Sequence, residues 1–171
     1  HEYLQEMNRR VLSKYDIITV GECAGVTLEE AKKYANSEGT ELNMVFQFEH
    51  VGLDGDAEFK WSTRKMPLVP LKENLTKWQK GLPWNAIYFE NHDQPRCIDH
   101  YFPWVSDSEN GSEESMAAKV IGTLMFTLRG TPFVYQGQEL GMRNVAWDSI
   151  DCYNDISSHG QYAFALSEGL S

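Results

Sequence analysis

Short β-branched runs alternate with helical patterns along the chain, and this alternation limits the fold more than any other feature. Four apolar runs are typical of buried strands: "IITVG" (17–21), "LNMVFQF" (42–48), "AIYFE" (86–90) and "FVYQG" (133–137). A stretch with apolar residues at helical spacing precedes each run, at residues 2–14, 27–39, 70–81 and 116–128. A fourfold repeat of helix and strand predicts parallel strands joined by helical crossovers, and hence an α/β fold.

Local signals mark the ends of two of these helices. Thr27 and Glu30 form a capping-box pattern, and Gly39 is a plausible stop for the same helix. Pro70 opens the next helix and Gly81 ends it. The less regular stretch through Asp54, Asp56 and Trp61 predicts a surface excursion, and residues 106–115 predict an acidic loop.

Two architectures satisfy the alternation: an open doubly wound sheet, and part of a (β/α) barrel. No GxGxxG or GxxxxGK[ST] motif follows any of the strands, so the usual phosphate-binding reasons for an open sheet are missing. A complete barrel needs eight strand–helix units in about 250 residues. The 171 residues supply four such units, which is half of a barrel.

The charge and composition exclude several classes of partner. The formal net charge of −10 repels a phosphate backbone or an anionic membrane surface, so we expect neither nucleic acid nor membrane as a partner. An aromatic content of 12% suits a neutral, polyhydroxylated ligand better. The cysteines are widely spaced and odd in number, and no CxxC pair occurs. We therefore expect reduced thiols, no metal site or cofactor, and a cytoplasmic location.

Polar and acidic residues follow each predicted strand, at the edge where parallel α/β folds bind ligands. The four strand ends are Gly21–Glu22, Phe48–Glu49–His50, Glu90–Asn91–His92–Asp93 and Gln136–Gly137–Gln138–Glu139. A single carboxylate there is often only a turn or capping residue. Several carboxylates at one rim repel one another, which separates their pKa values and permits acid and base roles. Glycosidic-bond cleavage uses such carboxylates.

Four sequence blocks resemble consecutive motifs of the α-amylase superfamily, glycoside hydrolase family 13. They are "TVGECAGVT", "NMVFQFEH", "ENHDQPR" and "GTPFVYQGQELGM", and they are most similar to its α-glucosidase, oligo-1,6-glucosidase and dextran glucosidase branch. The resemblance covers the chain apart from the acidic loop near Asn110 and the tail after His159. It implies a (β/α)8 (TIM) barrel, of which residues 1–171 form a partial catalytic domain covering about strands 5–8, without the N-terminal half-barrel and the C-terminal β-domain.

The same resemblance implies roles for individual residues. Glu22 matches the general acid/base, and Asp93 matches the carboxylate that stabilises the transition state. His92 matches the histidine that hydrogen-bonds the sugar, and Phe48 matches an aromatic residue lining the pocket. Gln94 and Arg96 are candidates for substrate contact. We interpret His50 and His100 as structural polar residues rather than metal ligands.

The family's nucleophile, an aspartate in a Gly-Phe-Arg-x-Asp setting, has no counterpart in this sequence. The resemblance places it, and any calcium loop, in the missing N-terminal half. We therefore expect that the chain acts on an oligosaccharide substrate only together with the other half of its barrel, and that the isolated fragment is inactive.

Several activities remain open within the resemblance. The leading prediction is retaining hydrolysis of terminal α-1,6- or α-1,4-glucosides. Trehalose-6-phosphate hydrolase is an alternative. Sucrose isomerases carry an Arg-Leu-Asp-Arg-Asp loop after the third block, where this chain reads "RCIDHYF". A non-catalytic barrel like that of transporter heavy chains would lose the catalytic carboxylates, whereas Glu22 and Asp93 persist. A sugar-binding module without chemistry is the remaining alternative.

Overall fold

The computed structural model describes residues 1–55, 65–105 and 111–169. Its helices are α1 (Glu2–Arg10), α2 (Leu28–Tyr34), α3 (Leu68–Gly81), α4 (Cys97–Tyr101), α5 (Ser112–Thr127) and α6 (Ile156–Ser167). Its strands are β1 (Val20–Glu22), β2 (Met44–Phe46), β3 (Ala86–Ile87) and β4 (Thr131–Pro132). Short 3-10 turns are η1 (Leu12–Lys14), η2 (Glu49–Val51), η3 (Gln138–Leu140) and η4 (Ile150–Cys152). The excursion expected at Asp56 and Trp61, and residues 106–110 of the expected acidic loop, lie outside the described residues.

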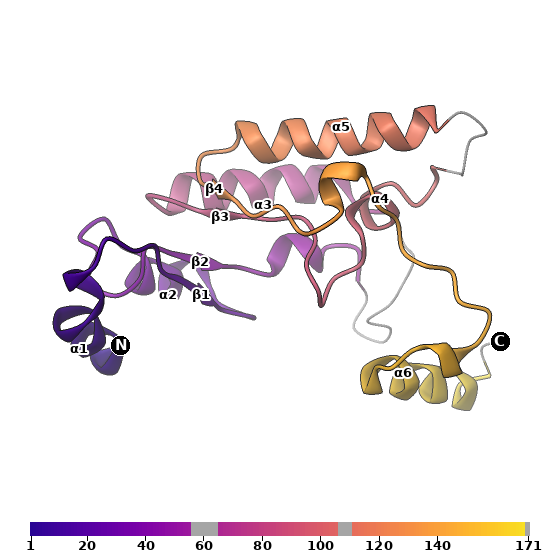
Figure 1. Cartoon of the computed structure of the whole chain (residues 1–171), viewed down its shortest axis with the longest axis horizontal. Coiled ribbons are helices and arrows are strands. Elements are labelled where there is room, and N and C mark those ends of the chain that lie inside the picture. Colours follow the sequence, from indigo (N-terminus) through magenta and orange to yellow (C-terminus); the bar gives the residue numbers. More distant parts are fainter. Residues whose placement is uncertain (56–64, 106–110, 170–171) are drawn as a thin grey trace.

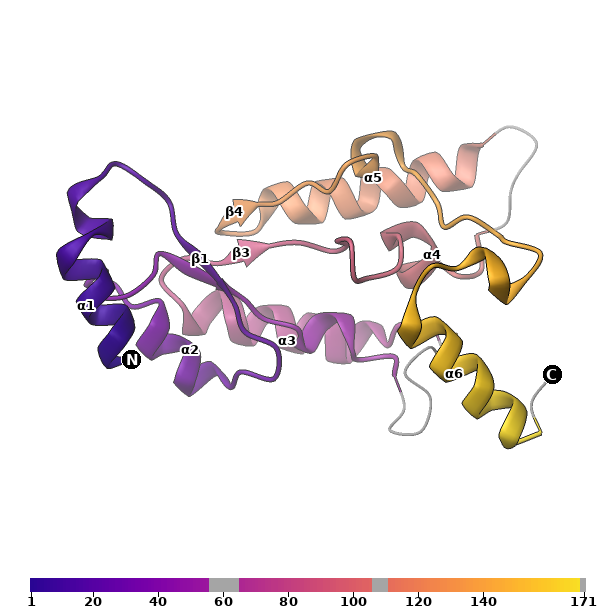
Figure 2. The same ribbon diagram turned by 60° about the horizontal axis from the view of Figure 1, so that its bottom comes forward.

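The described strands form two parallel pairs, which confirms the parallel arrangement. Strand β1 pairs with β2, with Glu22 opposite Phe46, and β3 pairs with β4, with Ala86 opposite Thr131. Strands β2 and β3 are in contact although no ladder joins them. Helices α3 and α5 run alongside β3 and β4 in both views (Figures 1 and 2).

Two apolar clusters hold these layers together. One packs β3 against α4 and α5 through Ile87, Phe89, Ile98, Ile121 and Met125. The other packs β2 between α2 and α3 through Ala31, Ala35, Val45, Trp78 and Leu82. Burial of these side chains is the main force that fixes the strands against their helices.

The strands are shorter than the apolar runs that predicted them. β1 starts at Val20, and Ile17 and Ile18 before it are 47% and 72% exposed. β4 lies before "FVYQG" rather than within it, although the Phe133 N–H still donates to the Ile87 carbonyl at 2.8 Å. An apolar run shows which residues can be buried. A strand also needs an adjacent strand with which its backbone forms hydrogen bonds. Within the described residues, Ile17 and Ile18 have no such strand beside them.

The start of α2 is confirmed, and its expected end is wrong. The Glu30 N–H donates to Thr27 Oγ1 at 3.2 Å, as a capping residue requires. The helix ends at Tyr34 rather than near Gly39. The Leu42 N–H donates to the Tyr34 carbonyl at 2.9 Å, so the chain has already turned back toward β2 at that point.

Helix α3 matches its prediction, with Pro70 in the first turn and Gly81 at the end. Helices α4 and α6 were not expected. Helix α4 has five residues, too few for a periodic pattern. Helix α6 begins directly after Asp155, because the Asp155 carboxylate accepts the Ser158 N–H at 2.6 Å and caps the helix. In Figure 1, α6 stands apart from the strands.

The element order and parallel pairing agree with an α/β barrel segment. The described strands do not close into a barrel, and their assignment to strands 5–8 stays a prediction. None of the helices in the described residues is both long and apolar enough to cross a bilayer.

Candidate active site

Glu22 is the exposed last residue of β1, at the carboxyl end of the first parallel pair. The next residue stays on the ladder, since the Cys23 N–H donates to the Phe46 carbonyl at 3.1 Å. Burial raises the pKa of the Tyr88 hydroxyl, and the negative charge of Glu22 raises it further. Glu22 thus lies at the carboxyl end of β1, opposite Phe46 of β2, and its charge acts on Tyr88, which follows β3.

Aromatic rings join the strand ends beside Glu22. The Phe46 ring packs edge-on against Tyr88 at 5.3 Å and against Phe133 at 4.6 Å between ring centroids. The half-buried Phe48 ring also contacts Tyr88, with 5.9 Å between ring centroids. Rings contributed by three strand ends thus form an aromatic floor, in which Tyr88 is buried and the phenylalanine rings are half-buried. Phe48 belongs to this floor, and its contact with substrate stays a prediction.

His92 and Asp93 lie on an exposed turn after β3. Their side chains are 71% and 62% exposed, and His92 Nε2 lies 3.3 Å from Asp93 Oδ2. The Asp93 N–H donates to Asn91 Oδ1 at 2.8 Å, and the Gln94 N–H donates to the Asn91 carbonyl at 3.3 Å. Asn91 therefore shapes the turn through its side chain, which is a common use of asparagine. The turn presents an imidazole and a carboxylate together to solvent.

Arg96 is mostly buried, and its side chain binds other protein groups. Its Nη1 donates to Glu90 Oε1 at 2.7 Å and to the Gln136 carbonyl at 2.7 Å. The guanidinium also lies 4.9 Å from the centre of the Tyr135 ring. Contact between Arg96 and substrate stays a prediction. In the structure, the Arg96 side chain instead links Glu90 to the Gln136 carbonyl. Gln94 is half-buried on the same turn.

His50 and Tyr88 connect the two strand pairs, and the sequence did not indicate that role for Tyr88. His50 Nε2 lies 2.7 Å from the Tyr88 carbonyl, and its Nδ1 lies 2.8 Å from Gln47 Nε2. The Tyr88 hydroxyl donates to the Gln47 carbonyl at 2.8 Å. These partners require a neutral ring that donates from Nε2 and accepts at Nδ1. Complete burial lowers the pKa of His50 to about 4, against the opposing effect of the Tyr88 carbonyl.

His100 is also occupied by a protein partner. Its Nε2 lies 2.9 Å from Asp54 Oδ2, and both side chains are buried. In the ranges that the structure describes, no group of three or more His, Cys, Asp or Glu side chains is arranged to hold a metal ion. The interpretation of His50 and His100 as structural residues agrees with these contacts.

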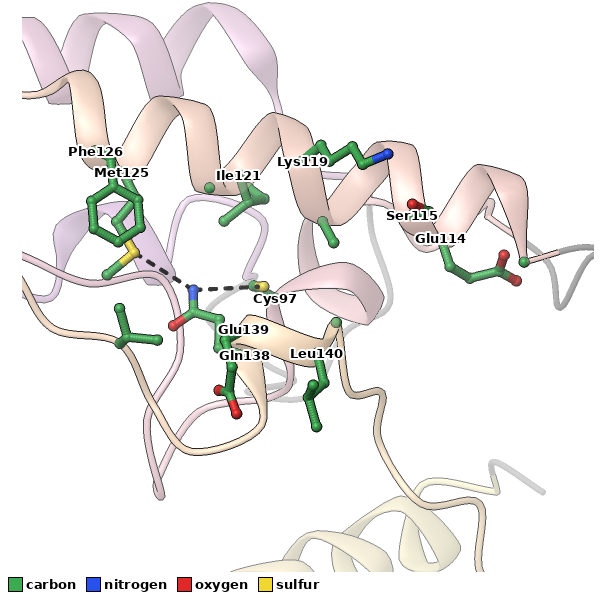
Figure 3. A pocket seen from close by; sticks show the side chains of 15 residues that line it. Cys97, Glu114, Ser115, Lys119, Ile121, Met125, Phe126, Gln138, Glu139 and Leu140 are labelled. Atoms are coloured by element: carbon green, nitrogen blue, oxygen red, sulfur yellow. Dashed lines mark hydrogen bonds between the residues drawn. The ribbon is translucent and has the colours of Figure 1, made fainter.

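A cavity of about 520 Å³ lies elsewhere, between α5 and the segment around η3 (Figure 3). Gln138 reaches across it, with its Nε2 3.9 Å from Cys97 Sγ and 3.8 Å from Met125 Sδ. None of the six candidate site residues lines this cavity. The strand-end rim that carries Glu22, rather than this cavity, is the candidate active site.

Comparisons with known proteins give the family. The model of the α-amylase catalytic domain matches residues 1–164. Oligo-1,6-glucosidase of Bacillus cereus is 49% identical over 98% of this chain and 30% of its own length. Trehalose-6-phosphate hydrolase of Bacillus subtilis strain 168 is 37% identical over 100% of this chain and 30% of its own length.

Solved structures agree with these matches. Trehalose-6-phosphate hydrolase of Bacillus licheniformis superposes with a TM-score of 0.86 at 39% identity, covering 100% of this chain and 30% of that one. An isomaltulose synthase mutant (E295Q) from Erwinia rhapontici NX5, solved with sucrose, gives a TM-score of 0.84 at 37% identity over the same shares. These neighbours belong to a family of (β/α)8 barrel enzymes, which is consistent with the fold predicted for this chain.

The matches also correct one expectation. The resemblance was expected to stop at His159, but the family model continues to residue 164 and the Bacillus cereus relative covers 98% of the chain. The chain spans about 30% of the length of the relatives it matches. With a family model covering most of its residues, the chain belongs to the α-amylase family and matches a part of that family's catalytic domain.

Proposed function

We propose that the protein carrying this chain is a retaining α-glucosidase that hydrolyses terminal α-1,6- or α-1,4-glucosidic bonds of short oligosaccharides. The observation that carries the proposal is the position of Glu22, at a strand end beside an aromatic floor and close to Tyr88. Relatives named oligo-1,6-glucosidase, such as the one from Bacillus cereus, support the choice of substrate.

In this proposal, Glu22 acts first as an acid and then as a base. It protonates the leaving glycosidic oxygen and later takes a proton from the water that releases the sugar. Asp93 accepts hydrogen bonds from sugar hydroxyls that strengthen as positive charge develops on the ring. His92 donates a hydrogen bond to the sugar, while Phe48 and Gln94 line the pocket.

The covalent nucleophile would come from a segment outside this chain. The relatives are about three times as long as their match to it, which leaves room for that segment. We propose that residues 1–171 form part of a (β/α)8 barrel domain, about strands 5–8, and depend on the remaining half. The free thiols Cys23, Cys97 and Cys152 support a cytoplasmic location.

A substrate panel on the intact protein tests the proposal. Isomaltose and maltose should be cleaved, and proton NMR during the first minutes should show α-glucose before mutarotation, because two displacements preserve the anomeric configuration. Release of β-glucose first would contradict a retaining mechanism. An absence of turnover on every α-glucoside would contradict the α-glucosidase assignment.

Trehalose-6-phosphate hydrolysis is the second candidate. The Bacillus licheniformis enzyme of that name superposes over the whole chain with a TM-score of 0.86. Its 39% identity is lower than the 49% of the Bacillus cereus oligo-1,6-glucosidase, so we place it second. A kcat/KM for trehalose 6-phosphate at least about tenfold above that for isomaltose would reverse the order. Sucrose conversion to an isomer, rather than to glucose and fructose, would indicate an isomaltulose synthase.

A further inference from the structure

We propose that Glu90 and Arg96 form a clamp that positions Asp93, and that Arg96 acts through this clamp rather than by contact with the sugar. The clamp joins the two ends of the turn 91–95, which carries His92 and Asp93. Both members are positioning residues, and the role given to Asp93 rests on the proposed function.

Glu90 is the inner half of the clamp. It is 1% exposed, and both of its carboxylate oxygens are occupied. Oε1 accepts from Arg96 Nη1 at 2.7 Å, and Oε2 accepts from the Cys97 N–H at 2.7 Å. A buried carboxylate is costly unless it is paired and fully hydrogen-bonded. One side chain thus closes the loop from residue 90 to residue 97 at its base.

Arg96 extends the clamp to the chain beyond β4. Besides Glu90, its Nη1 reaches the Gln136 carbonyl at 2.7 Å, and its guanidinium lies against Tyr135. Its backbone N–H donates to Asn144 Oδ1 at 2.9 Å. The side chain is 17% exposed. Its hydrogen bonds therefore fix the turn to two separate segments, and all of these partners are protein groups.

The turn itself has only weak internal support. The Asp93 and Gln94 amides bond to Asn91 within the turn, while the His92 and Asp93 side chains are exposed. The position of the Asp93 carboxylate therefore depends on the base of the loop. A displacement of about 1 Å at a reacting group can cost about 100-fold in rate. A clamp with charge-assisted bonds at 2.7 Å suits that requirement.

Kinetics of the intact protein test this role. Arg96→Gln should lower kcat by about 100-fold with KM changed less than about threefold, because geometry at the reacting centre is lost and binding is kept. Arg96→Lys keeps the charge near Glu90 and should recover activity to within about tenfold of the wild type. The matched control is Arg129→Gln, since Arg129 Nη2 binds the Leu82 carbonyl at 2.9 Å before β3, away from the rim. It should leave kcat within about threefold.

Amide hydrogen exchange provides a second measurement that does not need activity. In Arg96→Gln, exchange at Asp93 and Gln94 should be at least about tenfold faster than in the wild type, and it should be unchanged in Arg129→Gln. A raised KM with unchanged kcat would overturn the clamp and restore direct sugar contact. Unchanged exchange in Arg96→Gln would overturn it too. If the wild type cleaves no α-glucoside, the proposed function fails and the exchange result alone decides for or against the clamp.

Discussion

Glu22 is the residue on which the proposed chemistry depends; its predicted place at a strand end is confirmed, and its role stays a prediction. It directly follows a β-branched run, and the carboxyl ends of parallel strands are where ligands bind. Asp93 could be located for the same reason. The pairing of Glu90 with Arg96 could not, because the five residues between them have no regular spacing. The sequence suggested a rim contact for Arg96, whereas the burial of Glu90 draws its side chain inward.

Replacement of Glu22 should slow hydrolysis to different extents for substrates with different leaving groups. In the intact protein, Glu22→Gln removes the acid that protonates the glycosidic oxygen, so hydrolysis of isomaltose should fall by about 1000-fold. The loss at the first step should be far smaller with p-nitrophenyl α-glucoside, whose leaving group needs little protonation. Steady-state and pre-steady-state kinetics on both substrates measure this. Equal losses on the two substrates would argue against an acid role, and Thr27→Ala is a nearby control outside the rim.

His50 should make the stability of the protein sensitive to acid. Its folded pKa of about 4 lies below the ordinary histidine pKa of 6.5, so the unfolded chain binds the proton more readily. The stabilisation is fully present above pH 6.5 and is lost as the pH falls from 6.5 to about 4. It amounts to about 3 kcal/mol over that range. The groups whose charges act on His50 are His100, which lowers its pKa further, and Glu49, which raises it.

Urea unfolding of the intact protein at several pH values from 7.5 to 4.5 measures this effect. His50→Gln cannot titrate and should flatten the slope between pH 6.5 and 4.5. The exposed His159, whose ring binds the Tyr153 carbonyl, is the matched control, and His159→Gln should leave the slope unchanged. Equal slopes in the wild type and His50→Gln would contradict the assignment.

At the scale of elements, the sequence located helices better than strands. Helix α3 keeps its predicted Pro70 and Gly81, and α2 keeps its Thr27 cap, because caps and breakers act within one turn. Strand limits depend on a neighbour that is distant in sequence. Phe133 to Gly137 read as a strand because the run is apolar, yet β4 is already over at Pro132. Helix α6 was missed because its acidic cap, Asp155, resembles a loop residue until its bond to Ser158 is known.

Two glycine substitutions should shift stability in opposite directions. A Cβ at Gly130 would collide with the Asn85 carbonyl oxygen and lie 2.8 Å from Ile87 Cγ1, where β4 meets β3. Gly130→Ala should therefore destabilise the intact protein by about 1–3 kcal/mol. Gly122 in α5 has no such neighbour within 4 Å, so Gly122→Ala should stabilise the protein by about 0.5–1 kcal/mol. Thermal unfolding of both variants compares them directly, and a neutral Gly130→Ala would contradict the close approach.

At the scale of the whole molecule, the described part of the chain exposes many large apolar side chains. Those near the strand pairs and α5 include Ile18, Phe126, Val134 and Leu140. These exposed side chains support the proposal that residues 1–171 depend on the rest of a barrel.

The isolated chain should therefore be inactive. At equal molar concentration, residues 1–171 should give no turnover of p-nitrophenyl α-glucoside, whereas the intact protein should, since a retaining mechanism needs its nucleophile. Size-exclusion chromatography should show association through the unpaired strand edges. The control is the Asp93→Asn variant of residues 1–171, purified in the same way. Any turnover in this sample comes from contaminating host enzymes. Normal turnover by the wild-type chain would refute the assignment of the nucleophile to another segment.

The junction between β2 and β3 affects how easily the spacing between the two strand pairs can change. Glu22 belongs to one strand pair and Asp93 follows the other, and His50 and Tyr88 provide hydrogen bonds between the pairs where no ladder does. A ladder fixes spacing through the backbone and leaves little room for variation. Side-chain bonds can be exchanged one residue at a time, so selection or engineering could adjust the spacing of these two carboxylates without rebuilding either strand pair.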